Sequence, residues 1–143
     1  SALMDVSSVT AGNLPSYKYS RSGSEDGLKL YGSSLLLKDK TTIRIYYELK
    51  SGSITDYTFK IDNEVVTPVQ SGNNGLYYVE VRDIAAQDLE TSHTFSAGQL
   101  ELSNFSALSH VYSVLNYAQS ASENKNAMAA LYLYWQAAEK YFN

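Results

Sequence analysis

Histidine and serine are the first residue types to weigh, because together with a carboxylate they can form a nucleophilic triad. The chain has two histidines, His93 and His110, and Ser106, Ser109 and Ser113 lie within helical reach of His110. No G-x-S-x-G turn accompanies them, and serines near a histidine on a helix are expected by chance. We therefore predict no enzyme activity, with His110 on the polar flank of a helix and His93 in a strand or turn.

Carboxylates offer a second kind of chemistry, as glycosidase acid and base or as metal ligands. The densest groups among the fifteen carboxylates are Glu25-Asp26 and Asp62-Asn63-Glu64, and neither has the alternating ligand spacing of a calcium loop. The chain has no cysteine, which excludes disulfides, thiolate nucleophiles and Cys-ligated metals. It also lacks the glycine-rich phosphate motifs. We expect no cofactor and no metal site, and a structural calcium ion stays open as an alternative.

Tyrosine is the one enriched residue type, with thirteen copies. Tyr47 and Tyr77 alternate in phase with the apolar residues of their predicted strands, whereas Tyr46 and Tyr78 fall on the opposite face among arginines and glutamates. Rings on a polar face suit stacking on sugars or contact with a protein. The candidate ligand-binding residues are therefore Tyr46, Tyr78, Tyr17, Tyr19, Arg44 and Arg82. The alternative is that predicted helices cover this face and make Tyr46 and Tyr78 part of the core.

Most of these side chains lie in a region of short strands. Apolar and polar residues alternate clearly over 41–50 and 76–84, as expected for half-buried strands, and Gly32 interrupts a weaker strand signal over 28–37. Pro68 restricts the stretch that follows it to an edge strand or an irregular strand, and 71–75 is the strongest turn. About seven strands separated by regular turns predict an antiparallel, immunoglobulin-like β-sandwich.

After residue 102 the apolar period changes to that of amphipathic helices. We expect one helix from Phe105, with Ser103 or Asn104 as its N-cap, and a second helix that begins at the capping box 120–123 and continues to the end. Trp135 lies on the apolar stripe of this second helix. Neither helix can bury its stripe alone, so we expect a helical hairpin packed on the β part.

The chain of 143 residues has room for one α+β module and an appendage. We predict an irregular segment or linker over 1–27 and a module over 28–143, divided into a β part (28–102) and a hairpin (103–143). The formal net charge of −4 leaves no basic field for nucleic acid, and no apolar run is long enough to cross a membrane.

Three stretches suggest a family. They are LYYVEVRDIAAQDL (76–89), FSALSHVYSVL (105–115) and ALYLYWQAAEKYF (130–142). Together they resemble an uncharacterised accessory module of large extracellular and cell-surface proteins of gut and rumen Firmicutes, over about 28–143. The resemblance implies a non-catalytic module beside other domains of a longer chain, and it transfers no site residues.

Our first functional hypothesis is an extracellular or cell-surface module of a polysaccharide-degrading or surface protein that binds glycan through exposed tyrosines. The alternative is a structural spacer, or a protein-interaction or adhesion module, without glycan binding. The expected partners are a polysaccharide or another cell-surface protein, together with the neighbouring domains. We expect neither nucleic-acid binding nor membrane insertion.

Overall fold

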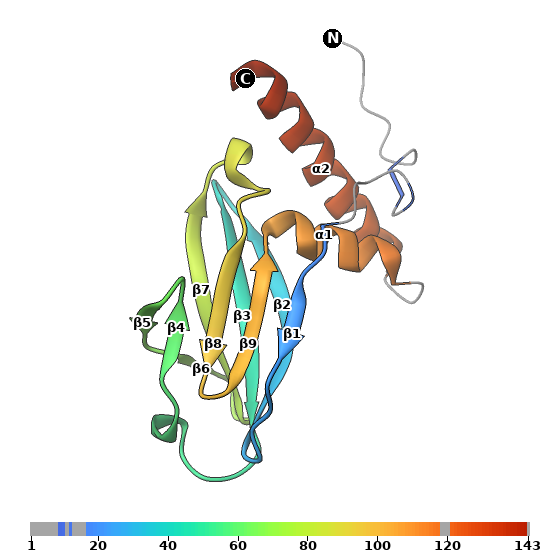
Figure 1. The fold of residues 1–143 in the computed structure, drawn as a ribbon. Helices are drawn as coiled ribbons and strands as arrows, with labels where there is room; N and C mark the ends of the chain where they lie inside the picture. Colours follow the sequence, from blue (N-terminus) through green and yellow to red (C-terminus); the bar gives the residue numbers. More distant parts are fainter. Residues whose placement is uncertain (1–8, 11, 13–16, 118–120, 143) are drawn as a thin grey trace.

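The computed structural model describes residues 9, 10, 12, 17–117 and 121–142. These residues form two antiparallel β-sheets followed by two α-helices (Figure 1). This confirms the predicted α+β class with antiparallel sheets and a C-terminal pair of helices.

The first sheet has the strand order β2-β3-β7-β6. Its strands are β2 (Leu28–Leu37), β3 (Thr41–Leu49), β7 (Leu76–Ile84) and β6 (Val69–Ser71). A register shift between Leu30 and Gly32 bulges β2 without ending it, so the weak signal at Gly32 marks a bulge inside one strand. The strand after Pro68 lies at the sheet edge, as expected.

The second sheet has the strand order β1-β9-β8-β4-β5. Its strands are β1 (Ser20–Ser22), β9 (Leu100–Phe105), β8 (His93–Ala97), β4 (Phe59–Ile61) and β5 (Glu64–Val66). Asp62 and Asn63 turn β4 into β5 with φ values of 51° and 70°, a left-handed conformation that Asp and Asn tolerate.

The N-terminal segment that we expected to be irregular contributes β1, which pairs with β9. Within 1–27, residues 1–8, 11 and 13–16 lie outside the described part of the chain. The strand spans Ser20–Ser22, the stretch that finds backbone partners on β9.

The two sheets face each other through one continuous core. The alternating residues Ile43, Ile45 and Tyr47 of β3 point into this core and are buried. The ring of Tyr47 meets the ring of Phe59, from the other sheet, edge to face at 5.1 Å between centroids. Strand alternation therefore identifies correctly which tyrosines of β3 belong to the core.

The helices are α1 (Ala107–Asn116) and α2 (Ser122–Phe142), and short 3-10 turns are η3 (Ile54–Asp56) and η4 (Ala86–Asp88). The expected end of the β part at residue 102 and the expected caps of the first helix are wrong, because β9 continues through Asn104 to Phe105. Ser106 is the N-cap: it accepts from the Ser109 N–H, and the Ser109 hydroxyl accepts from the Ser106 N–H. Ser120, in the second predicted capping box, lies outside the described residues.

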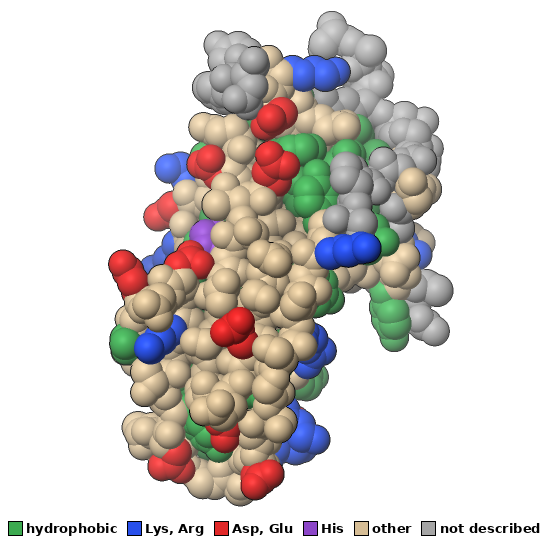
Figure 2. Space-filling model, viewed as in Figure 1, with side chains coloured by type: hydrophobic (Ala, Val, Ile, Leu, Met, Phe, Trp, Pro, Cys, Tyr) green, Lys and Arg blue, Asp and Glu red, His purple; other side chains and the backbone are tan. Residues whose placement is uncertain are grey.

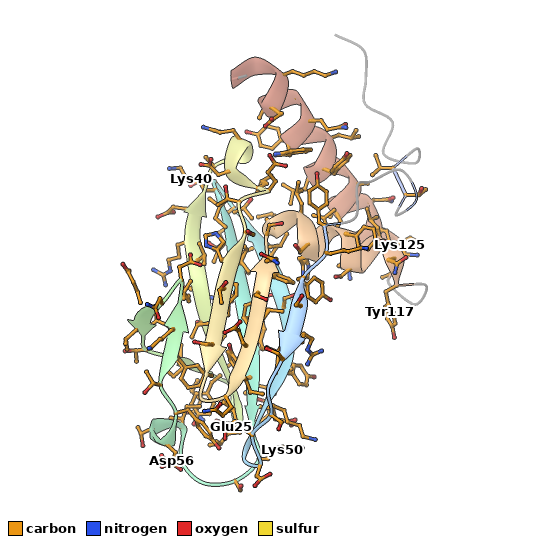
Figure 3. All side chains as sticks on the ribbon, viewed as in Figure 1. Glu25, Lys40, Lys50, Asp56, Tyr117 and Lys125 are labelled. Atoms are coloured by element: carbon orange, nitrogen blue, oxygen red, sulfur yellow. The ribbon has the colours of Figure 1, made fainter. Side chains whose placement is uncertain are left out.

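Both helices lie at one end of the two sheets (Figure 1), where α2 packs on α1 and on η4. Trp135 of α2 is 8% exposed and Tyr132 is also buried. Glu25, Lys50 and Asp56 lie at the opposite end of the sheets, and Tyr117 lies at the helical end (Figure 3). Among the described residues, neither helix is long and apolar enough to span a membrane.

Candidate functional site

The candidate tyrosines of the first sheet form a pair on its outer face. Tyr46 of β3 and Tyr78 of β7 are opposite each other in the strand register, on the side away from the core residue Tyr47. Their ring centroids are 5.7 Å apart at an interplanar angle of 50°. The hydroxyl of Ser34, on β2, donates to the Tyr46 hydroxyl at 3.2 Å. Both rings are partly exposed, so each keeps surface for a ligand.

Two arginines and one glutamate border this pair. Arg44 lies opposite Glu80 in the register, and its Nε donates to Glu80 Oε2 at 2.9 Å. Arg82 Nε donates to the other carboxylate oxygen, Oε1. The Arg44 guanidinium also lies over the Tyr78 ring, 4.0 Å from its centroid, in cation–π geometry. We call Arg44, Tyr46, Tyr78, Glu80 and Arg82 the tyrosine platform.

The ion pairs of the platform remain charged over the physiological pH range. Desolvation acts to raise the pKa of Glu80, but the hydrogen bonds from Arg44 and Arg82 outweigh it and the pKa is lowered. The hydrogen bond to Glu80 likewise raises the pKa of Arg44, with burial opposing it. The carboxylate therefore fixes two guanidinium groups beside two aromatic rings.

The alternative prediction is that the two helices cover the sheet face that carries Tyr46 and Tyr78, and the helices do not lie there. They lie at one end of the sheets (Figure 1), and Tyr46 is shielded by its neighbours in the sheet. Gly32 of β2 is opposite Tyr46, and a Cβ atom built at Gly32 would meet nothing within 4 Å. The surface beside Tyr46 is consequently open.

Tyr17 and Tyr19 lie in a different part of the molecule. Tyr17 packs edge-on against Trp135 at 6.3 Å, and Tyr19 against Phe105 at 5.0 Å. Burial raises the pKa of Tyr17 to about 12. The six candidate residues therefore separate into the platform residues Arg44, Tyr46, Tyr78 and Arg82 and these two tyrosines at the helical end.

The helical end has a tyrosine-lined groove of its own. It has a volume of about 470 Å³ and includes Tyr17, Tyr19, Tyr112 and the exposed Tyr117 in its lining. The hydroxyl of Ser113 donates to the Tyr19 hydroxyl at 3.4 Å. No charged pair comparable to Arg44–Glu80 is found among the described residues of this groove.

His110 contacts the sheet and not the serines of its own helix. Its Nδ1 is 2.7 Å from the hydroxyl of Ser33 on β2, whereas Ser106 and Ser109 bond each other in the helix cap. Burial lowers the pKa of His110 to about 4, so the imidazole is neutral at pH 7. The prediction that His110 lies on a polar flank is wrong, because α1 turns this side chain toward β2. A histidine with so low a pKa is a weak general base.

His93, in β8 as expected, ties the β4–β5 turn to the sheet. Its Nδ1 is 2.7 Å from Asp62 Oδ2, and Asp62 Oδ1 accepts from the Thr94 N–H at 2.8 Å. Desolvation opposes these two bonds, but together they lower the pKa of Asp62. This arrangement explains one of the dense carboxylate groups as turn structure. Within the part of the chain that the structure describes, no cluster of His, Asp or Glu could hold a metal ion.

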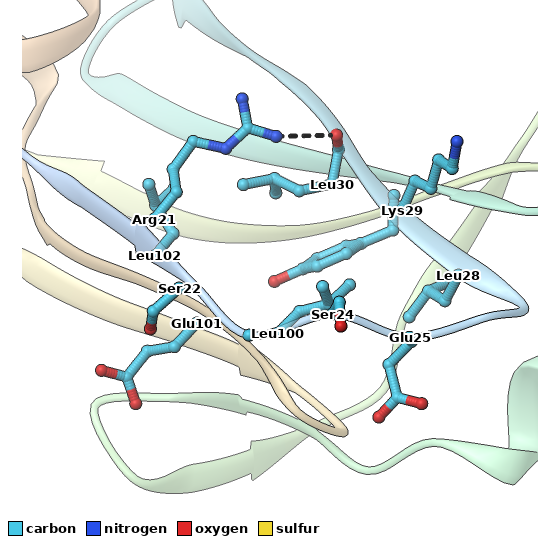
Figure 4. Close-up of a pocket in the computed structure, with 12 residues that line it drawn as sticks. Arg21, Ser22, Ser24, Glu25, Leu28, Lys29, Leu30, Leu100, Glu101 and Leu102 are labelled. Carbon is cyan, nitrogen blue, oxygen red and sulfur yellow. Dashed lines mark hydrogen bonds between the residues drawn. The ribbon is translucent and has the colours of Figure 1, made fainter.

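A cavity of about 290 Å³ opens between the two sheet edges at β1 and β2 (Figure 4). Core residues such as Leu28, Leu102 and Tyr47 reach into it, and Arg21 and Glu25 stand at its rim. Two of the charged lining residues have backbone partners: Arg21 donates to the Leu30 carbonyl and Glu25 accepts from the Gln99 N–H. Two further charged residues, the exposed Lys29 and Glu101, also line the cavity.

Comparisons with family models, with curated proteins and with solved structures find no match to this chain. The resemblance to the extracellular Firmicutes module therefore stays a prediction.

Sequence reasoning missed three features of these sites. They are the Ser33–His110 contact, the cavity at the β1–β2 edges, and the shared use of Glu80 by two arginines. The first two join segments that lie far apart in the chain, so no local sequence pattern predicts them. The third had a signal, since Glu80 and Arg82 lie two residues apart on a strand and therefore share a face.

Proposed function

We propose that this chain is a non-catalytic, extracellular or cell-surface module that binds glycan on the tyrosine platform. The observation that carries the proposal is the partly exposed Tyr46–Tyr78 pair fixed beside Arg44, Glu80 and Arg82. Aromatic rings offer flat apolar surface to the C–H faces of sugars, and charged groups beside them offer hydrogen bonds to hydroxyls.

Preorganisation supports a binding role for these residues. Cross-strand neighbours hold each ring, and the guanidinium over Tyr78 restricts its rotamers. Side chains that are ordered before a ligand arrives lose less entropy on binding. The platform also lies on two long central strands, a more rigid support than a loop.

We also propose that the sheets form an immunoglobulin-like sandwich. With β2 taken as strand A and β9 as strand G, the orders β2-β3-β7-β6 and β9-β8-β4-β5 become A-B-E-D and G-F-C-C′. These orders correspond to the two sheets of the constant-type immunoglobulin domain, with C′ added. In this scheme β1 is an extra strand beside G.

The alternative function is a spacer or protein-interaction module without glycan binding. It is favoured by one observation: Arg44 already covers one side of Tyr78, which is also what a purely structural pair would show. The same experiment separates the two functions.

Affinity electrophoresis against a panel of plant polysaccharides and starch tests the proposal. We expect retardation on at least one polymer, and its loss in Tyr46→Ala and Tyr78→Ala. Tyr134→Ala is the matched control, because Tyr134 is 60% exposed on α2, away from the platform, and its removal should leave the mobility shift unchanged. No retardation on any polymer would contradict glycan binding and favour the spacer.

A second variant blocks the platform without removing any of its groups. Gly32→Leu adds a side chain beside Tyr46, where the space is open, so the fold should tolerate it. Retardation should weaken while the unfolding midpoint stays close to that of the wild type. Unchanged retardation would place the ligand elsewhere, and the groove at Tyr17 and Tyr19 would be the next surface to test.

A further inference from the structure

The charges of the tyrosine platform are unequally exposed. The Glu80 side chain is 11% exposed, because its two oxygens face the two arginines, whereas the Arg82 side chain is 72% exposed. A ligand that approaches this face therefore meets guanidinium groups and little of the carboxylate.

The platform also carries a net positive charge. Two guanidinium groups share one carboxylate, which leaves one positive charge on a chain whose formal net charge is −4. Local charge of this sign attracts anionic ligands and disfavours cationic ones.

The bond between Arg82 and Glu80 uses one side of the guanidinium group and leaves its two terminal nitrogens available to a ligand. Only its Nε bonds Glu80, and within the described part of the chain its two terminal nitrogens have no other hydrogen-bond partner. Two parallel N–H groups match the two oxygens of a carboxylate and form the strongest kind of charge-assisted pair. Arg44 adds a second positive charge beside Arg82, because its bond to Glu80 holds its guanidinium over Tyr78.

We propose that the ligand class of this platform is an acidic polysaccharide that contains uronic acids. The carboxylate of a uronate binds the terminal nitrogens of Arg82, and a sugar ring of the same chain packs against the part of Tyr46 and Tyr78 that Arg44 leaves uncovered. This inference rests on the proposed glycan-binding function and narrows it to one class of polymer.

Polygalacturonate and its fully methyl-esterified form test this inference, because they share a backbone and differ in whether each carboxyl group is a free carboxylate or an uncharged methyl ester. Affinity electrophoresis of the intact chain should show retardation by polygalacturonate that is at least about tenfold stronger than by the ester. The retardation should weaken as salt is added.

Variants of Arg82 assign the preference to this residue. Arg82→Gln should bind both polymers equally weakly, and Arg82→Lys should keep part of the preference because it retains the charge but loses the paired donors. Arg21→Gln is the matched control, since Arg21 is another exposed arginine but lies on β1 and bonds a backbone carbonyl. Thermal unfolding of each variant checks that the fold is intact.

The outcomes separate this inference from the proposed function. The acidic class would be overturned if the chain bound both polymers equally, or bound neutral polymers alone. Glycan binding would still stand in either case, provided that Tyr78→Ala abolished the retardation. A preference for polygalacturonate that survives in Arg82→Gln would overturn the assignment to Arg82. Retardation by sulfated dextran as strong as by polygalacturonate would show that charge alone is recognised and would overturn the uronate assignment. No binding of any acidic or neutral polymer would end both proposals.

Discussion

The outer face of the first sheet and the helical end both contain tyrosines, but the two regions use them differently. At the helical end, Tyr17 and Tyr132 surround Trp135, and the cluster continues the hydrophobic core. On the sheet face, Tyr46 and Tyr78 touch each other and an arginine held by a glutamate. The first set contributes stability by burial, and the second stays partly exposed on the outer face of the sheet.

The view of Figures 1 and 2 looks onto the second sheet and the helices. On the face seen in Figure 2, hydrophobic side chains gather over α2, whereas charged side chains are scattered singly over the sheets. Removing a ring at the helical end should therefore cost mainly stability, and removing one on the platform should cost mainly binding.

The largest expected effect is at the helical end. Trp135→Ala should lower the free energy of unfolding by about 3–5 kcal/mol, because the ring is 8% exposed and its loss leaves a cavity. Trp135→Phe is the control and should cost less, since the indole Nε1 has no hydrogen-bond partner among the described residues. Urea denaturation measures both. A loss under about 1 kcal/mol for the alanine variant would mean that the ring does not anchor the helices.

The next effect depends on pH and concerns the contact between α1 and β2. The pKa of His110 is lowered from 6.5 to about 4 in the fold, so between these values the unfolded state binds more protons. Stability from this group is fully present above pH 6.5, is lost as the pH falls toward 4, and amounts to at most about 3 kcal/mol. His110→Gln should flatten this part of the stability curve, and an unchanged curve would show that His110 is accessible to protons in the fold.

A smaller effect belongs to the platform. Glu80→Gln should cost about 1–2 kcal/mol, because it removes the charge that holds two arginines together. Glu48→Gln is the matched control: its pair with Lys50, at 3.4 Å, is more exposed and should be worth under about 0.5 kcal/mol. If the two variants lost the same free energy of unfolding, the ion pairs of Glu80 would contribute no more than an ordinary exposed pair.

The smallest effect on stability should come from the platform ring itself. Tyr78→Ala should cost about 1 kcal/mol, the low end of what one partly exposed aromatic pair and one cation–π contact contribute together. The double-mutant cycle with Arg44→Gln measures how much of this comes from the cation–π contact. A cost as large as that of Trp135→Ala would place Tyr78 in the core and remove the difference between the two regions.

The alternation of residues was sufficient to predict several parts of this fold. It separated Tyr47 from Tyr46 correctly, since successive side chains of a strand point to opposite faces. Helical spacing likewise placed Trp135 on the buried stripe of α2. The start of α1 was misplaced, because Asn104 adopts a φ of 58° inside the end of β9 and the true cap is Ser106.

The candidate site was predictable only as a list of residues. Strand phase put Arg44, Tyr46, Tyr78 and Arg82 on polar faces, but the pairing of β3 with β7 is what brings them together. Tyr17 and Tyr19 joined the same list because no local signal places an irregular segment in space, and tertiary contacts put them at the helical end.

The sequence by itself determined the α+β class of the fold, the main turns and the side of β3 that faces the core. These depend on periodicity and local backbone preference, which neighbouring residues express. Only the tertiary structure decided that the helices pack at one end of the sheets, that His110 reaches Ser33, and that Glu80 serves two arginines. These features depend on packing between distant segments. For the tyrosines, strand phase placed Tyr47 correctly in the core, whereas Tyr77, which has the same phase, is only partly buried. The structure defines which rings stand together.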